Sequence, residues 1–332
     1  MTTKRELFDT ILLLALPASG KSEVRKFLSS FDGAACRDHF RMGETVQLDD
    51  YPYVHMMRRI DEARRAQGAE GAIFAAPDAG FADPRDWGTL IELINEDFAD
   101  LRVCGARPGG SAARWLISRL DRARSKVGAA PVGAGLSRSG LEAVETAIEG
   151  DAAALVRDKW AAIPGSLDGR TVVIEFARGG AQGSAMPLAA PFGYRYSLGR
   201  LSDDLLSRAA ILYIWVTPEQ SRAKNEGRAD PNDPGSILHH GVPLRVMLGD
   251  YGCDDIENLL DEGEDGTSVR VTSAATGRVF RVPTARLDNR ADLTTFARAE
   301  QRTWDPAAAT ALRGALAAAF STLWSSGAGN RR

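Results

Sequence analysis

Cysteine is scarce in this sequence: Cys36, Cys104 and Cys253 are the only three among 332 residues. An odd number of widely spaced cysteines provides no framework of disulfide bonds. This usage is typical of a reducing compartment, so we expect a cytoplasmic location. A cysteine-based metal centre is not predicted either, because Cys36 and His39 supply only half of a four-ligand set.

Long apolar runs are also missing. The uninterrupted run near the start, Ile11 to Leu16, has six residues, whereas a membrane span needs roughly 18. A secretory signal needs an apolar region of about 7–15 residues and a small-residue cleavage site. Asp9 precedes this run and Lys21 follows it closely. The sequence therefore predicts neither a membrane span nor a secretory signal.

Neither sign of charge dominates, since 41 basic and 44 acidic residues give a net charge of -3. This balance predicts no general attraction to nucleic acid or to anionic lipid. One predicted helix is locally basic through Arg114, Arg119, Arg122, Arg124 and Lys126. That face either meets an anionic ligand or is simply solvated. Nucleic acid is therefore not expected as a partner but is not excluded.

The stretch "ILLLALPASGKSEV", from Ile11 to Val24, has the pattern of a buried strand, a loop and an amphipathic helix. Within it, residues 15–22 fit the phosphate-binding pattern G-x-x-x-x-G-K-[ST], except that Ala15 replaces the first glycine. In such a loop, backbone N–H groups point inward and surround phosphate oxygens. The alternative is a Gly-Lys-Ser that follows a buried strand by chance.

The loop pattern assigns a role to each of its residues. Gly20 would allow close approach to a phosphate, Lys21 would reach the β- and γ-phosphates, and Ser22 would ligate Mg²⁺. The expected nucleotide-binding residues are Leu16, Pro17, Ala18, Ser19, Gly20, Lys21, Ser22 and Glu23.

Strand and helix patterns alternate along the chain, which predicts an α/β fold of three layers with a parallel central sheet. Residues 102–167 have little strand signal and predict a helical insertion, whereas residues 267–283 alternate like a small β-hairpin. The expected core comprises residues 1–101 and 168–330.

Five short motifs resemble those of P-loop kinases of the nucleoside- and adenylate-kinase-like group. They are "ALPASGKSE", "VQLDDY", "VVIEFARGG", "ILYIWVTPEQSRAKNEGR" and "RLDNRAD". The resemblance implies an ATP-dependent phosphotransferase that requires Mg²⁺, acts on a small-molecule acceptor and closes a mobile lid. The lid-like region would be residues 217–265.

The resemblance also implies residue roles. Asp49 or Asp50 would orient or deprotonate the acceptor hydroxyl, although both could instead cap the next helix. Glu175, at the end of a predicted buried strand, would support Mg²⁺. Arg178 matches a phosphate- or substrate-binding position. Tyr194, from its residue type alone, could stack on a base or sugar, or could be a partly buried tyrosine.

Arg222 and Arg228 match the lid arginines that close over the transferred phosphoryl group, or lie on a solvated helix face. Two other functions remain open from the sequence. One is a P-loop ATPase or nucleotide switch that acts on a protein partner, and the other is a kinase of a modified base in DNA. The sequence does not define the acceptor, the choice between ATP and GTP, or the oligomeric state.

Overall fold

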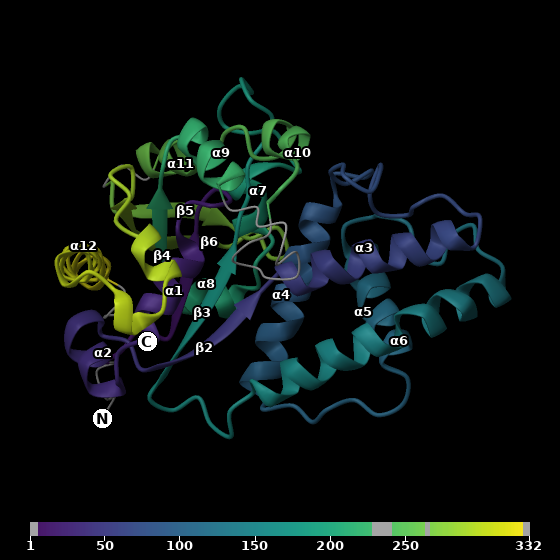
Figure 1. Cartoon of the computed structure of the whole chain (residues 1–332), viewed down its shortest axis with the longest axis horizontal. Coiled ribbons are helices and arrows are strands. Elements are labelled where there is room, and N and C mark those ends of the chain that lie inside the picture. Colours follow the sequence, from purple (N-terminus) through teal and green to yellow (C-terminus); the bar gives the residue numbers. More distant parts are fainter. Residues whose placement is uncertain (1–5, 228–240, 263–265, 328–332) are drawn as a thin grey trace. The chain divides into compact units, whose positions relative to one another are not determined.

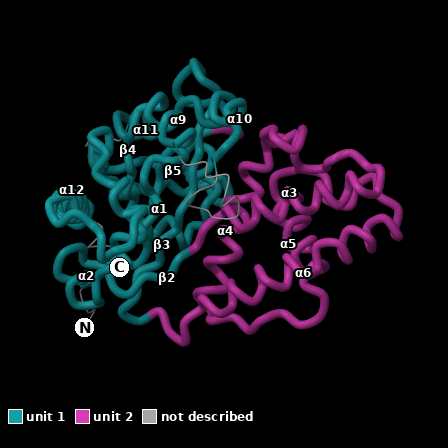
Figure 2. The backbone as a smooth tube through the Cα atoms, in the orientation of Figure 1, with its two compact units in different colours: residues 1–47, 168–189, 193–332 teal, residues 48–167, 190–192 magenta. Residues whose placement is uncertain are grey.

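Figure 1 shows the computed structural model, which describes residues 6–227, 241–262 and 266–327. The chain forms two compact units, which are coloured separately in Figure 2. The sheet unit comprises residues 1–47, 168–189 and 193–332, and the helical unit comprises residues 48–167 and 190–192. No helix among the described residues is both long and apolar enough to cross a lipid bilayer.

A mostly parallel sheet of six strands is found among the described residues. Its strands are β1 (Thr10–Leu14), β2 (Glu44–Asp49), β3 (Arg170–Phe176), β4 (Ala209–Trp215), β5 (Ser268–Thr272) and β6 (Val279–Asp288). Their order in the sheet is β2-β3-β1-β4-β6-β5. β1 runs parallel to its neighbours β3 and β4. This arrangement confirms the α/β class expected from the sequence.

Helices cover both faces of this sheet. In the sheet unit they are α1 (Lys21–Leu28), α2 (Gly33–Phe40), α7 (Gly193–Gly199), α8 (Asp203–Arg208), α9 (Pro218–Glu226), α10 (Leu244–Gly249), α11 (Ile256–Asp261) and α12 (Pro306–Ser325), with short 3₁₀ turns at Thr295–Arg298 and Gln301–Thr303. One face of β1, with Ile11 and Leu13, packs in a core with Leu312 and Leu316 of α12. Tyr194 of α7 lies near Phe176 on the other face. All five residues of β1 are buried, as expected for a central strand.

The predicted hairpin is present, but it is longer than expected. β5 pairs antiparallel with β6 from Val279 to Pro283, and β6 then pairs parallel with β4 from Thr284 to Asp288. The sequence predicted a hairpin that ends at Pro283, whereas β6 continues to Asp288. β6 continues through Pro283 as one strand because proline lacks only the N–H donor. Pro283 lies where the pairing of β6 changes from β5 to β4.

The helical unit begins earlier than the expected insertion at residue 102. It contains α3 (Tyr51–Ala66), α4 (Asp86–Arg102), α5 (Ala112–Lys126) and α6 (Arg138–Ala161). α3 packs on α6, and α5 packs on both α4 and α6. The predicted boundary at residue 102 therefore placed α3 and α4 in the core, although α3 packs on α6 and α4 packs on α5.

A buried ionic network joins the four helices of this unit. Tyr53 Oη of α3 donates to Asp97 Oδ1 of α4 over 2.7 Å, and Arg119 Nη2 of α5 donates to the same oxygen over 2.7 Å. Lys159 of α6 forms an ion pair with Asp97 as well. Arg119 Nη1 also lies 2.9 Å from Asp100 Oδ2. Opposite charges are matched within the network, and its contacts link all four helices of the unit.

Candidate functional site

A tight turn of residues 15–20 connects β1 to α1; we call it the 15–20 turn. Two of its residues have left-handed backbone conformations, Ala18 with φ 55° and Gly20 with φ 108°. A Cβ atom at position 20 would lie 2.5 Å from Thr294 Oγ1 and 2.8 Å from Asn289 Nδ2. Both the backbone conformation and the lack of space therefore require glycine at this position.

Carbonyl groups of this turn are held by side chains from three distant elements. The hydrogen bonds run from Tyr194 Oη to Ala15 O (2.9 Å), from Ser221 Oγ to Pro17 O (2.7 Å) and from Asn289 Nδ2 to Ser19 O (2.8 Å). Gly20 O accepts the first helical bond of α1, from Val24 N, over 2.9 Å. These contacts fix the conformation of the turn through its acceptor groups.

The backbone N–H groups of the turn differ from its carbonyl groups in their hydrogen bonding. In the described part of the chain, no hydrogen bond is found for the backbone N–H groups of Ala18, Ser19, Gly20 and Ser22. They lie at the N-terminus of α1, where the helix dipole is positive. Backbone N–H groups gathered in a left-handed turn at a helix N-terminus form a concave site that favours anions.

Lys21 and Ser22 add side-chain groups to this concavity. Lys21 Nζ lies 3.3 Å from Ala15 O and 3.2 Å from Leu16 O, and the residue is buried. The ammonium group is therefore folded against the turn itself. Ser22 is also buried, and its hydroxyl has no hydrogen-bond partner among the described residues.

Glu175 lies near the end of β3, directly beside β1. It is paired in register with Leu13, and its Oε2 lies 3.3 Å from Arg25 Nη1 of α1. Ser22 and Arg25 are three residues apart on α1 and so share one side of the helix. The Ser22 hydroxyl and the Glu175 carboxylate are oxygen ligands of the kind that Mg²⁺ accepts, with the remaining positions left to water or phosphate. No cluster of three His, Cys, Asp or Glu side chains that could hold a metal is found in residues 6–227, 241–262 and 266–327.

Glu23, another of the expected nucleotide-binding residues, contacts the segment before α12. Its carboxylate is buried and accepts a hydrogen bond from Arg298 Nε over 2.7 Å, which ties α1 to the segment before α12.

Asp49 and Asp50 belong to the second half of β2 and the start of the helical unit. Asp49 Oδ1 accepts a hydrogen bond from Tyr51 N over 2.8 Å. Asp50 occupies the N-cap position of α3, yet its side chain makes no capping hydrogen bond. The capping interpretation thus applies to Asp49, and Asp50 is not needed for it.

Arg178 and Tyr194, the other expected substrate-binding residues, are both buried. Arg178 is 2% exposed, lies over the ring of Phe176 at 5.1 Å and donates to Ala177 O. Tyr194 is 0% exposed, so its ring has no free face for a base or sugar. The expectation of stacking on Tyr194 is therefore not compatible with this structure, because packing against Phe176 and the 15–20 turn covers the ring.

Arg222 lies on α9, next to the residue that holds the turn. Its neighbour Ser221 donates to Pro17 O, which places the start of α9 beside the turn. Arg222 Nη2 is 3.1 Å from Glu219 Oε1, while Nη1 is buried and has no hydrogen-bond partner in residues 6–227, 241–262 and 266–327. Arg228, the other expected lid arginine, lies outside the described residues.

The side-chain hydrogen bonds to the carbonyl groups of the turn were not predicted from the sequence. Ser221 was not singled out, Asn289 was not assigned this contact, and Tyr194 was assigned a different role, the stacking of its ring. These residues follow the turn by about 180–280 positions in the chain. A side chain so far from its partner has no local pattern that could reveal it.

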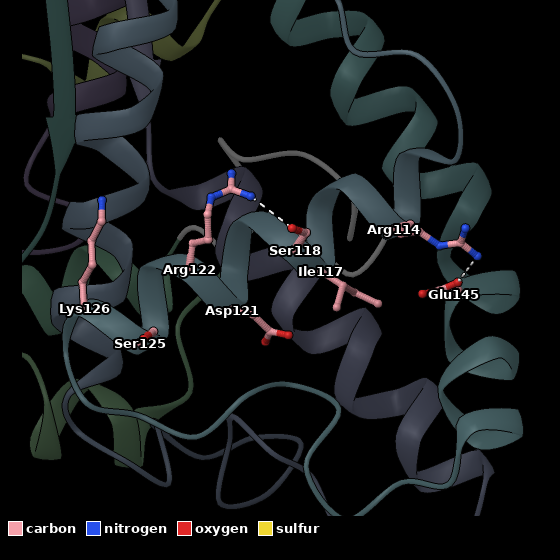
Figure 3. Close-up of a pocket in the computed structure, with 8 residues that line it drawn as sticks. All are labelled: Arg114, Ile117, Ser118, Asp121, Arg122, Ser125, Lys126 and Glu145. Carbon is pink, nitrogen blue, oxygen red and sulfur yellow. Dashed lines mark hydrogen bonds and ion pairs between the residues drawn. The ribbon is translucent and has the colours of Figure 1, made fainter.

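The basic face expected on α5 is largely neutralised within the helical unit. A surface hollow of about 590 Å³ lies along α5. Figure 3 shows residues that line it, with Arg114 bonded to Glu145 and Arg122 to Ser118. Lys126 Nζ lies 3.4 Å from Glu92 Oε2. Arg124, another member of the predicted face, is buried in an ion pair with Asp86. These pairs leave little net charge to attract nucleic acid.

Comparisons with protein-family models, with curated proteins and with solved structures give no match for this chain. The residues and geometry of the site are therefore the basis for inferring its function. Chemically, the 15–20 turn offers backbone donors and a lysine, and Glu175 adds a carboxylate. This combination can bind an anion together with a divalent cation.

Proposed function

We propose that this protein is an ATP-dependent, Mg²⁺-requiring phosphotransferase that moves the γ-phosphoryl group to a small-molecule acceptor. The observation that carries the proposal is the 15–20 turn. Its carbonyl groups accept hydrogen bonds from Tyr194, Ser221 and Asn289, while the backbone N–H groups of Ala18, Ser19, Gly20 and Ser22 have no hydrogen-bond partner within the described residues. A row of phosphates is the ligand that best matches such donors beside a lysine.

Phosphoryl transfer requires positioning and neutralisation of charge more than covalent help. In the proposal, Lys21 leaves the carbonyl groups of the turn and contacts the β- and γ-phosphates. Ser22 and Glu175 would hold Mg²⁺, which would supply positive charge to offset that of the phosphates. Arg222, adjacent to the turn through Ser221, would contact the transferred group, and Arg228 would act with it.

On the acceptor side, Asp49 or Asp50 at the end of β2 would be the carboxylate that orients or deprotonates the acceptor hydroxyl. A kinase of a modified base in DNA is less favoured, since the basic side chains of α5 are paired with carboxylates.

A label-transfer experiment tests the proposal. The protein would be mixed with Mg²⁺, a metabolite extract and ATP that carries heavy oxygen in its γ-phosphate, and the products would be read by mass spectrometry. We expect label in one class of metabolite, and a loss of about a thousandfold or more in the Lys21→Ala variant. The matched control is Lys26→Ala, which removes a lysine from the same helix whose Nζ donates to Arg298 O and Ala299 O, away from the turn.

Label found only in free phosphate would support the ATPase or nucleotide-switch alternative. Equal activity of the wild-type protein and Lys21→Ala would contradict the role of the 15–20 turn. A loss of activity in Lys26→Ala as large as in Lys21→Ala would show that the effect comes from damage to α1.

A further inference from the structure

The carbonyl group of Ala15 has two side-chain donors. Lys21 Nζ lies 3.3 Å from this oxygen and Tyr194 Oη lies 2.9 Å from it, and both contacts are buried. The proposed function requires Lys21 to leave this oxygen when phosphate binds. A buried carbonyl that loses its donor carries a substantial penalty unless another donor remains.

We propose that Tyr194 is a positioning residue that allows Lys21 to leave the turn and bind phosphate. This inference rests on the proposed function. The phenol keeps Ala15 O hydrogen-bonded in both states, so movement of the lysine does not expose an unsatisfied carbonyl. The same bond preserves the shape of the turn while Lys21 is engaged elsewhere.

The surroundings of Tyr194 suit this role. Asp255 accepts hydrogen bonds from Tyr194 N over 2.6 Å and from Arg195 N over 3.2 Å, which fixes the start of α7. Gly193 allows this approach, since a Cβ there would lie 2.7 Å from the Asp255 carboxylate. Burial raises the pKa of the Tyr194 phenol well above its usual value, so that it stays a neutral hydrogen-bond donor.

A double-mutant cycle on ATP affinity tests the inference. Dissociation constants for Mg-ATP would be measured by calorimetry for the wild-type protein, Tyr194→Phe, Lys21→Ala and the double variant. We expect Tyr194→Phe to weaken binding about tenfold, the scale of one buried hydrogen bond lost between the two states. In the Lys21→Ala background the same change should have less than about a twofold effect, because no lysine then has to leave Ala15 O.

Tyr213→Phe is the matched control. Tyr213 is also a buried tyrosine of the sheet unit, but its hydroxyl donates to Asp254 Oδ2 over 2.8 Å and does not contact the turn. Its loss should leave ATP affinity within about twofold of the wild type. An equal loss from Tyr194→Phe in both Lys21 backgrounds would overturn the positioning role and indicate a purely structural one.

No effect of Tyr194→Phe in the wild-type background would also overturn the inference. If the wild-type protein binds no ATP, the proposed function fails and the inference fails with it. If the wild type binds ATP and the cycle shows no coupling, the proposed function stands and only the role of Tyr194 is rejected.

Discussion

Polar groups are paired differently in the 15–20 turn and in the ionic network of the helical unit. In the network, Asp97 meets Tyr53, Arg119 and Lys159, so that charges and donors are matched inside the fold. In the turn, the carbonyl groups are held by side chains, while several N–H groups find no partner among the described residues. Matched groups stabilise a structure, whereas unmatched donors at a helix N-terminus are suited to an incoming ligand.

The largest effect on stability is expected from the network. Replacing Arg119 by Met would leave Asp97 and Asp100 with less positive charge in a buried site. Removal of one partner from a buried ionic network typically costs about 3–5 kcal/mol of unfolding free energy. We expect a loss of this size in urea unfolding, with unchanged ATP affinity in the protein that remains folded.

Arg114→Met provides the control for that experiment. Arg114 is on the same helix but is exposed, and it pairs with Glu145 at the surface. Its replacement should change stability little, because exposed ion pairs are screened by water. Similar losses from the two variants would show that the network is no more important than a surface pair.

The largest effect on ligand binding is expected from the turn itself. Gly20→Ala places a Cβ about 2.5 Å from Thr294 Oγ1 and forces an unfavourable φ on alanine. The turn must then shift, and its N–H groups with it, so we expect ATP affinity to fall about a hundredfold, or ~2.7 kcal/mol. Calorimetric titration with Mg-ATP measures this change.

Gly68→Ala separates backbone strain from steric overlap. Gly68 also has a positive φ, 75°, but nothing lies within 4 Å of the added Cβ. This variant should lose about 1–2 kcal/mol of stability and keep full ATP affinity. An undiminished affinity in Gly20→Ala would mean that the conformation of the turn does not matter for binding.

Local patterns in the sequence were sufficient to predict the framework of the site. A strand, a turn and a helix occur at residues 10–28, and the C-terminal hairpin occurs at β5 and β6, because strand alternation and turn glycines act over short distances. The end of β3 at Glu175 was predicted for the same reason.

Contacts between distant residues could not be predicted in this way. The Tyr194 hydroxyl meets Ala15 O across 179 positions, and Asn289 meets Ser19 O across 270. The extent of the helical unit was missed because Asp97 and Lys159 give no sign, in one sequence, that their helices pack together. Such pairings depend on the tertiary fold rather than on any local preference.

A smaller, pH-dependent effect is expected from Asp254, which, unlike Asp97, forms no ion pair with a cation of the described residues. Asp254 accepts a hydrogen bond from Tyr213 Oη over 2.8 Å. Burial, with lesser contributions from nearby Asp255 and Glu257, raises the pKa of Asp254 from 3.8 to about 7. The native state therefore binds this proton more tightly than the unfolded state. The contribution of the protonated Asp254 to the free energy of unfolding is complete below about pH 4 and is lost as the pH rises through about 7.

Asp254→Asn keeps a neutral group at this position at every pH. Relative to the wild type, the variant should gain stability as the pH rises from about 4 to about 8, by roughly 2 kcal/mol in total after allowance for partial exposure. Urea unfolding of both proteins at several pH values measures the difference. Parallel pH profiles of the unfolding free energy for the two proteins would mean that the pKa of Asp254 is not raised. A variant that gains stability toward low pH instead would mean that a cation stabilises the charged form of Asp254, as cations do at Asp97.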